Sequence, residues 1–195
     1  MGFSTHLGFE LFNDCLYYRR QALDLIEKDE VGNAFGIRRA LRSSFVCLSM
    51  YWESRLNNMV QNVVTQKLFE TKKVPRLEDH EVKRFDRFAR SDIGLKFQFL
   101  ELLTGVDFTV NKQVEQIQRI RNDILHKGHY DWSLTNEDFL SKLGEAITET
   151  RRFFAALAEK GLTSKDKFLM YEEPVDMTKL GYGHSQSNTA RKPKD

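Results

Sequence analysis

The chain has 195 residues, a length typical of a single domain. Hydrophobic residues make up 41% of it, and 15 Phe, six Tyr and two Trp supply large side chains for a core. The 30 Lys and Arg nearly balance the 28 Asp and Glu, giving a net charge of +2. This balance does not indicate a general nucleic-acid-binding protein, so any such activity would need local clustering of basic residues.

The two cysteines, Cys15 and Cys47, lie within apolar helical patterns and at no spacing suited to zinc. We therefore expect free, buried thiols in a reducing cytosol. The N-terminus has no basic region followed by an apolar run, so no signal peptide is indicated. No apolar run approaches the roughly 20 residues of a membrane span. We expect a soluble, cytoplasmic protein.

Two helices are predicted in the first part of the chain. Residues 8–29 have helical periodicity, and Gly32 stops or bends the pattern. Residues 33–70 form a longer helix of about 50 Å, which Pro75 ends. Apolar residues spaced by three and four form one stripe along it, consisting of Leu41, Phe45, Leu48, Trp52, Leu56, Met59 and Val63.

The middle of the chain is less regular. Residues 76–90 are highly charged and indicate a short helix or a structured loop. Residues 94–103 favour a helix, although the alternation of Phe97 and Phe99 leaves a strand possible. A further helix is predicted over residues 111–127, with Asn111 as its N-cap and Gly128 as its stop.

The last predicted helix is capped by Thr135 or Asn136, and Gly161 ends it. Its apolar face contains Phe139, Leu143, Ile147 and Phe154. The fold class that follows is all-α, an antiparallel bundle of four to five helices with one long central helix. Residues 1–165 would form the bundle, and residues 166–195 a partly ordered or disordered tail.

The stretch "RIRNDILHKGHYDW", residues 119–132, places several chemically active side chains near the end of the predicted helix. Asn122 and His126 are four residues apart and share a face. Arg121 is rotated from His126 by about 140°, yet its length allows both to reach one cleft. A histidine in the last helical turn suits acid–base chemistry. Alternatively, the Arg and the His cap carbonyl groups and pair with Asp123 or Glu115.

Two stretches resemble the HEPN superfamily (higher eukaryotes and prokaryotes nucleotide-binding domains). "RNDILH" at 121–126 is similar to its Arg-x4-6-His motif, which lies at the end of a late helix in bundles of four or five helices. "SSFVCLSMYWESRLNNMV" at 43–60 is similar to a helix of several bacterial subgroups in which an apolar run leads into Tyr-Trp-Glu. The resemblance covers roughly residues 8–160.

This resemblance implies a metal-independent endoribonuclease, a toxin or defence effector whose products carry 2′,3′-cyclic phosphate and 5′-hydroxyl ends. His126 would be the general acid/base, Arg121 would stabilise charge on the phosphorane, and Asn122 would orient His126 or the phosphate. HEPN domains usually form homodimers in which two motifs face each other across a composite cleft. Such an arrangement would supply both an acid and a base.

Further residues could contribute to this site. Glu53, beside Trp52, would pair with Arg121 or orient His126 if it faces inward, and otherwise is a solvated helix residue. Arg119 and Lys127 could hold an RNA backbone. Tyr130 could reach the same cleft. In HEPN toxins paired with nucleotidyltransferase antitoxins, a modified Tyr often lies two residues after the motif His.

Here Gly128 occupies the position of that Tyr, so regulation of this kind by an antitoxin is in doubt, although a regulatory partner remains possible. For Arg151 and Arg152 we favour a solvated helix face. The alternative function is a non-catalytic HEPN-like bundle that acts as a protein-binding or assembly module. A metal-dependent or nucleotide-cofactor enzyme has little support, because the sequence has neither a ligand cluster nor a phosphate-binding loop.

Overall fold

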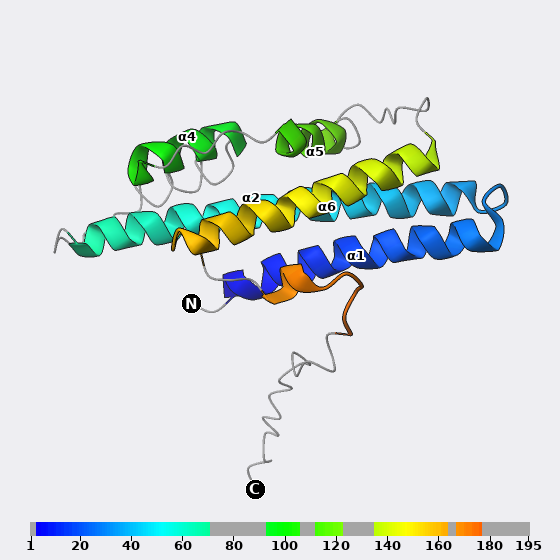
Figure 1. Cartoon of the computed structure of the whole chain (residues 1–195), viewed down its shortest axis with the longest axis horizontal. Helices are drawn as coiled ribbons and strands as arrows, with labels where there is room; N and C mark the ends of the chain where they lie inside the picture. The colour runs from blue at the N-terminus through cyan, green and yellow to red at the C-terminus, as the bar shows by residue number, and fades with distance from the viewer. Residues whose placement is uncertain (1–2, 71–92, 106–111, 123–134, 164–166, 177–195) are drawn as a thin grey trace, which may run out of the picture.

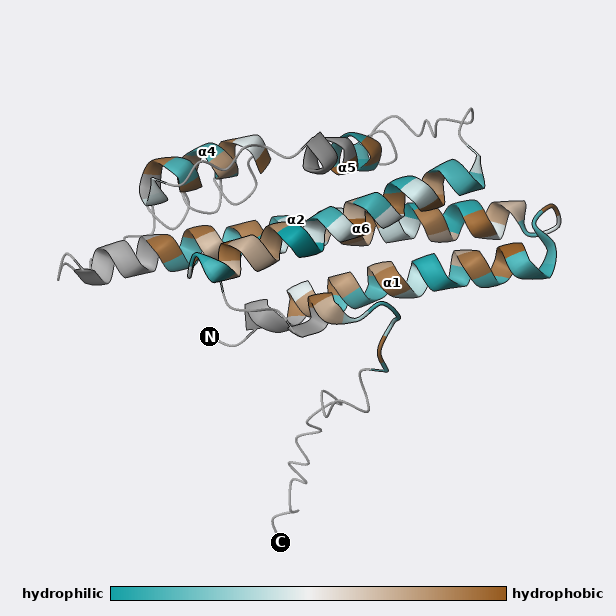
Figure 2. Cartoon of the chain, viewed as in Figure 1, coloured by the Kyte–Doolittle hydropathy of each residue, from teal (hydrophilic) through white to brown (hydrophobic). Residues whose placement is uncertain are grey.

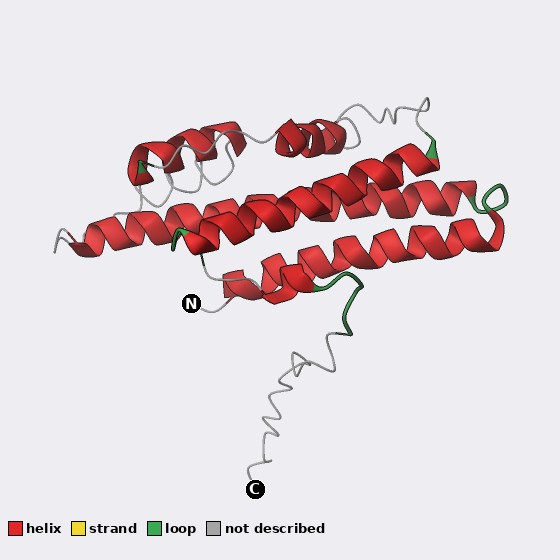
Figure 3. Cartoon of the chain, in the orientation of Figure 1, coloured by secondary structure: helices red, strands yellow, loops and turns green. Residues whose placement is uncertain are grey.

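The computed structural model describes residues 3–70, 93–105, 112–122, 135–163 and 167–176. Over these residues it contains helices and connecting loops but no strand (Figure 3). The elements in chain order are α1 (Phe3–Asp29), α2 (Ala34–Glu70), α4 (Ile93–Thr104), α5 (Lys112–Asn122), α6 (Asn136–Glu159) and the short 3-10 helix η2 (Lys167–Met170). The predicted all-α class is therefore confirmed.

Helix α2 is the centre of the bundle and contacts α1, α4, α5 and α6. Figure 1 shows α1, α2 and α6 side by side, with the shorter α4 and α5 on the side of α2 and α6 away from α1. With 37 residues, α2 is about 55 Å long. All seven residues of its predicted apolar stripe are buried. Brown and teal segments alternate along the helices in Figure 2, which is the pattern of amphipathic helices.

A tight hairpin joins α1 to α2. The backbone N–H of Gly32 donates to the Asp29 side chain, and the Asn33 side chain donates to the Leu25 carbonyl, so polar groups at the end of α1 are bound within the turn. Farther along the hairpin, the buried hydroxyl of Ser44 donates to the carbonyl of Cys15 at 2.7 Å. These contacts hold α1 and α2 antiparallel.

Both ends of α6 follow the predicted signals. Thr135 is the N-cap, and it forms a capping box with Asp138, since each side chain bonds the backbone N–H of the other residue. Gly161 follows the C-cap with a φ of +71°, a conformation that glycine adopts without steric cost. The predicted buried face of α6 is also confirmed.

The helix α4 resolves the ambiguity between helix and strand in residues 94–103. Phe97 is buried and its ring centroid lies 6.3 Å from that of Trp52 on α2. Phe99 is only partly buried against the core. The two residues therefore lie on different faces of a helix. A strand would have placed both on the same face, so the strand alternative is wrong.

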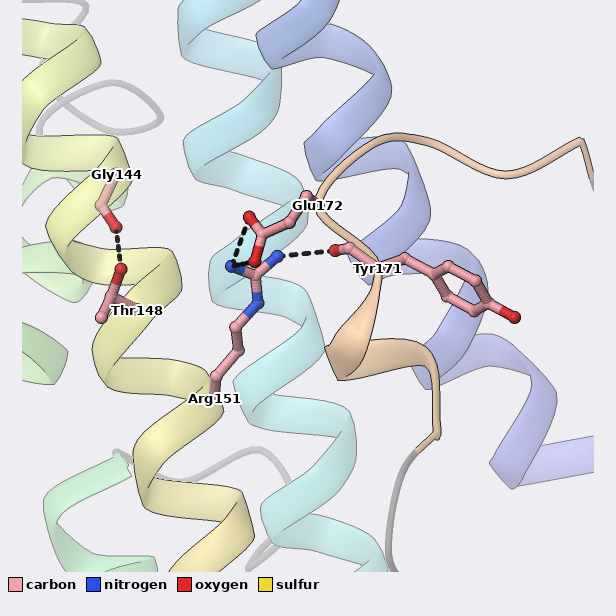
Figure 4. Close-up of polar contacts among 5 residues, drawn as sticks. All are labelled: Gly144, Thr148, Arg151, Tyr171 and Glu172. Atoms are coloured by element: carbon pink, nitrogen blue, oxygen red, sulfur yellow. Dashed lines mark hydrogen bonds and ion pairs between the residues drawn. The ribbon is translucent and has the colours of Figure 1, made fainter.

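Residues 167–176 pack against α1 and α6 (Figure 4). Leu169 is buried in the core, and the side chain of Asn13 exchanges two hydrogen bonds with the backbone of Val175. Arg151 donates to both carboxylate oxygens of Glu172 at 2.9 Å and to the carbonyl of Tyr171. The solvated position favoured for Arg151 is therefore wrong, whereas Arg152 is mostly exposed. Residues 177–195 lie outside the described part.

The two cysteines are free thiols, as predicted, but only Cys15 is fully buried. Burial raises the pKa of Cys15 to about 12 and, together with the charge of Asp14, that of the half-buried Cys47 to about 11. Neither thiol ionises near neutral pH. Among the described residues, no helix is long and apolar enough to cross a membrane.

Candidate functional site

The helix α5 is held on α2 by apolar and polar contacts. Ile117 is buried, and Ile120 packs partly buried against the core. The side-chain amide of Gln118 donates to the buried hydroxyl of Ser49 at 2.9 Å. Arg121 lies four residues after Ile117 and three after Gln118, so it shares their side of α5, and these contacts also direct it toward α2.

Arg121 contacts two of the other predicted site residues. Its Nη2 lies 3.8 Å from Oε1 of Glu53 on α2, and its Nη1 donates to Oδ1 of Asn122 at 2.9 Å. The two charged side chains are 25% and 35% exposed, so they are partly removed from water without being enclosed. Of the two positions left open for Glu53, the ion pair fits the one that faces Arg121, although the carboxylate is still partly solvated.

The geometry leaves part of the guanidinium group available. The Arg121 side chain is 25% exposed, although its Nε is buried and has no hydrogen-bond partner among the described residues. The distance to Glu53 exceeds that of a short charge-assisted hydrogen bond, so the carboxylate restrains the guanidinium group without binding it tightly. An anion that approaches from the exposed side could still bind to the Arg121 guanidinium.

The remaining predicted site residues are only partly placed. Arg119 is exposed on α5, where it could contact a ligand that lies across the helix. His126, Lys127 and Tyr130 lie outside the described residues, as does the predicted N-cap Asn111. The structure therefore brings together Arg121, Asn122 and Glu53 and leaves the position of the acid/base residue as a prediction.

No group of three or more His, Cys, Asp or Glu side chains that could hold a metal ion occurs in the described part of the chain. The chemistry available to the described site is thus that of a cation, a carboxylate and an amide. The cation and the amide can bind and orient a phosphate, while the carboxylate restrains the cation. Proton transfer near neutral pH would need a further residue.

Sequence reasoning missed two arginines that have structural roles. Arg55 is 6% exposed, donates to the hydroxyl of Thr163 at 2.8 Å and lies over the ring of Phe154. Arg151 lies over the ring of Phe12 in addition to its bonds to the C-terminal segment. The partners of each arginine lie more than four residues away in the sequence, so no local pattern could have revealed these contacts.

No protein-family model, curated protein or solved structure matches the chain. The HEPN resemblance therefore rests on the two sequence stretches described above.

Proposed function

We propose that the chain is a metal-independent endoribonuclease of HEPN type, a toxin or defence effector that acts in the cytoplasm as a homodimer. It would cleave RNA by attack of the 2′-hydroxyl on the adjacent phosphate, leaving 2′,3′-cyclic phosphate and 5′-hydroxyl ends. The observation that carries the proposal is the position of Arg121, which is held by Glu53 and Asn122 where α5 approaches the middle of α2.

The roles of these residues follow from their chemistry. Arg121 would stabilise the negative charge that develops on the phosphorane, and restraint by Glu53 reduces the reorganisation needed to do so. Asn122 keeps the guanidinium group oriented in the resting enzyme. His126 would transfer the protons, and the equivalent His of the second subunit would supply the complementary acid or base.

A non-catalytic helical bundle that binds another protein is the second candidate. It is favoured by one observation, namely that Arg121 already has an intramolecular carboxylate and amide partner. A structural ion pair at the surface of a bundle would have the same appearance. On this reading, replacing Arg121 or His126 leaves partner binding unchanged.

Cleavage of a fluorescent single-stranded RNA in EDTA distinguishes the two functions. We expect the wild type to cut the RNA, and Arg121→Ala and His126→Ala to reduce the rate by at least about 100-fold. Arg152→Ala is the matched control, since this side chain is 76% exposed on α6 and should leave the rate unchanged. Intact RNA with the wild-type protein would rule out the nuclease. Equal rates for all four proteins would rule out an active site that contains Arg121 and His126.

A further inference from the structure

A shallow pocket of about 330 Å³ lies on the α1–α2 hairpin, and no residue of another described element lines it. Its lining consists of Tyr18 from α1 and of Arg39, Arg42, Ser43, Val46 and Cys47 from α2. We call these six residues the hairpin pocket. The volume lies at the small end of the range for ligand pockets, and the lining combines guanidinium groups, a hydroxyl group and an aromatic ring.

The N-terminal half of α2, which forms most of the hairpin pocket, is basic. Residues 34–52 contain three arginines, Arg38, Arg39 and Arg42, and no Asp or Glu, so Glu53 is the first acidic residue of the helix. Arg39 and Arg42 are exposed, and Arg39 has no ion pair or hydrogen bond with the rest of the described chain. The nearly neutral chain thus concentrates positive charge at this pocket, as the binding of a polyanion requires.

The two arginines of the pocket converge, and a hydroxyl group lies beside them. The Nε of Arg42 donates to the carbonyl of Arg38 at 3.3 Å, one turn back, so this bond draws the Arg42 side chain toward Arg39. Ser43 is half-buried and lines the same pocket. Guanidinium and hydroxyl groups are donors that bind phosphate oxygens, and an arginine can do so through two parallel N–H groups.

The pocket also presents an aromatic ring. Tyr18 is half-buried, and its ring contacts that of Tyr17 edge to face, with the centroids 5.5 Å apart. This contact restricts the ring, so that less side-chain entropy is lost when a ligand binds. Aromatic rings stack on the π-face of any nucleobase, and such stacking holds single strands without a sequence requirement.

Acidic residues at the edge of the pocket set the direction of a bound nucleotide. Asp14 lies close enough to Cys47 to affect its ionisation, and Glu10 lies one turn before Asp14 on α1. These carboxylates repel a phosphate at the Cys47 end of the pocket. The phosphate is therefore expected at the end formed by Arg39 and Arg42.

The hairpin pocket and the candidate site lie along the same side of α2. Val46, Ser49 and Glu53 follow one another at steps of three and four residues, and Ser49 binds Gln118 of α5. Arg42 is eleven residues before Glu53, which corresponds to about 16 Å along the helix. A strand that leaves the pocket on the side away from α1 therefore reaches the candidate site.

We propose that the hairpin pocket binds one nucleotide of a single-stranded RNA, with the base stacked on Tyr18 and the phosphate bound by Arg39 and Arg42. The inference rests on the proposed nuclease and deepens it, since the pocket is a second contact with the substrate, away from the cleaved bond. It also assigns the substrate class. The bases of a duplex are already paired and stacked, so they are not free to lie against Tyr18.

Fluorescence anisotropy of a labelled single-stranded RNA in EDTA tests the phosphate contact. All proteins carry His126→Ala, so that the RNA stays intact. We expect Arg39→Ala to raise the dissociation constant at least about 5-fold and to lower the slope of log Kd against log salt concentration by about 0.7, the value for one phosphate of a single strand. Arg152→Ala, an exposed arginine of α6, is the control and should change neither quantity. An unchanged slope in Arg39→Ala overturns the phosphate contact.

Tyr18→Ala and Tyr18→Phe test the base contact. We expect the alanine variant to raise the dissociation constant at least about 10-fold at an unchanged salt slope, and the phenylalanine variant, which keeps the ring, to bind as the parent protein does. Tyr171→Ala, which alters a 40% exposed tyrosine of the C-terminal segment, is the control. Duplex RNA should bind more weakly and with no dependence on Tyr18. Unchanged affinity in Tyr18→Ala, or equal losses in both Tyr18 variants, overturns the base contact.

Two further measurements separate a free nucleotide from RNA and the pocket from the nuclease. Adenosine monophosphate that binds in a Tyr18-dependent way, while RNA does not, would assign the pocket to a free nucleotide and overturn the inference. Tyr18-dependent RNA binding by a chain that cuts no RNA refutes the nuclease alone. Cleavage with the same KM in the wild type, Arg39→Ala and Tyr18→Ala refutes the pocket alone.

Discussion

Two neighbouring residues of α2, Trp52 and Glu53, lie in opposite environments. Trp52 is fully buried, its indole N–H donates to Thr150 at 2.9 Å, and its ring centroid is 4.9 Å from those of Phe153 and Phe154. Glu53 is 35% exposed and has a 3.8 Å ion pair with Arg121. Two consecutive residues of one helix thus contribute to the core and to the candidate site, respectively.

The two environments differ in what a substitution can disturb. Around Trp52, apolar area and a buried hydrogen bond are both at stake, and each contributes free energy to folding. Around Glu53, water already screens the charges, so their interaction adds little to stability. Residues of the candidate site can therefore change without unfolding the bundle, which makes activity measurements on them interpretable.

Trp52→Ala should have the largest effect. Removal of the indole leaves a cavity among aromatic rings, and we expect the free energy of unfolding to fall by about 3–5 kcal/mol, measured by urea denaturation. Phe35→Ala on the same helix is the control, because Phe35 is 87% exposed and should change stability by less than about 0.5 kcal/mol. Equal losses in the two variants would contradict the burial of Trp52.

Thr150→Val isolates the buried hydrogen bond. Valine has nearly the same shape but cannot accept the indole N–H, so we expect a loss of about 1–3 kcal/mol. Thr148→Val is a matched control, since Thr148 makes the same bond to the carbonyl four residues back but is exposed (Figure 4). If both variants lose the same stability, the bond to Trp52 contributes nothing.

Thr135→Ala should remove the cap of α6 and lower stability by about 1 kcal/mol. Hydrogen bonds from Thr135 hold the pKa of Asp138 below its ordinary value of 3.8. A lowered carboxyl pKa stabilises the fold above pH 3.8, and this contribution is lost as the pH falls through the lower folded pKa. Acid denaturation of the variant should therefore depend less on pH below 3.8 than that of the wild type.

Arg121→Ala should have the smallest effect on stability. The ion pair with Glu53 is long and partly solvated, so we expect the free energy of unfolding to change by less than about 0.5 kcal/mol. Arg119→Ala, an exposed residue of the same helix, serves as the reference. A loss of several kcal/mol in Arg121→Ala would show that the ion pair contributes to folding. The contrast between the stabilising environment of Trp52 and the solvated environment of Glu53 would then not hold.

The sequence predicted most of the helices and the residues that they bury. The stripe on α2, the start of α6 and the stop at Gly161 all depend on spacing or on local backbone chemistry, so they could be found without a structure. The structure then chose Thr135 over Asn136 as the cap. For the site, the motif singled out Arg121 and Asn122. Whether Glu53 faces solvent or Arg121 could not be decided, because the answer depends on how α5 lies on α2.

The sequence by itself determined an all-α chain with one long central helix, since helical periodicity and capping act over a few residues. Only the tertiary structure decided which polar residues pair. Arg55 binds Thr163 and Arg151 binds Glu172, although each arginine resembles a solvated helix residue in the sequence. The physical reason is that an ion pair or hydrogen bond between distant segments forms only after packing has brought the helices together, and no local pattern encodes that contact.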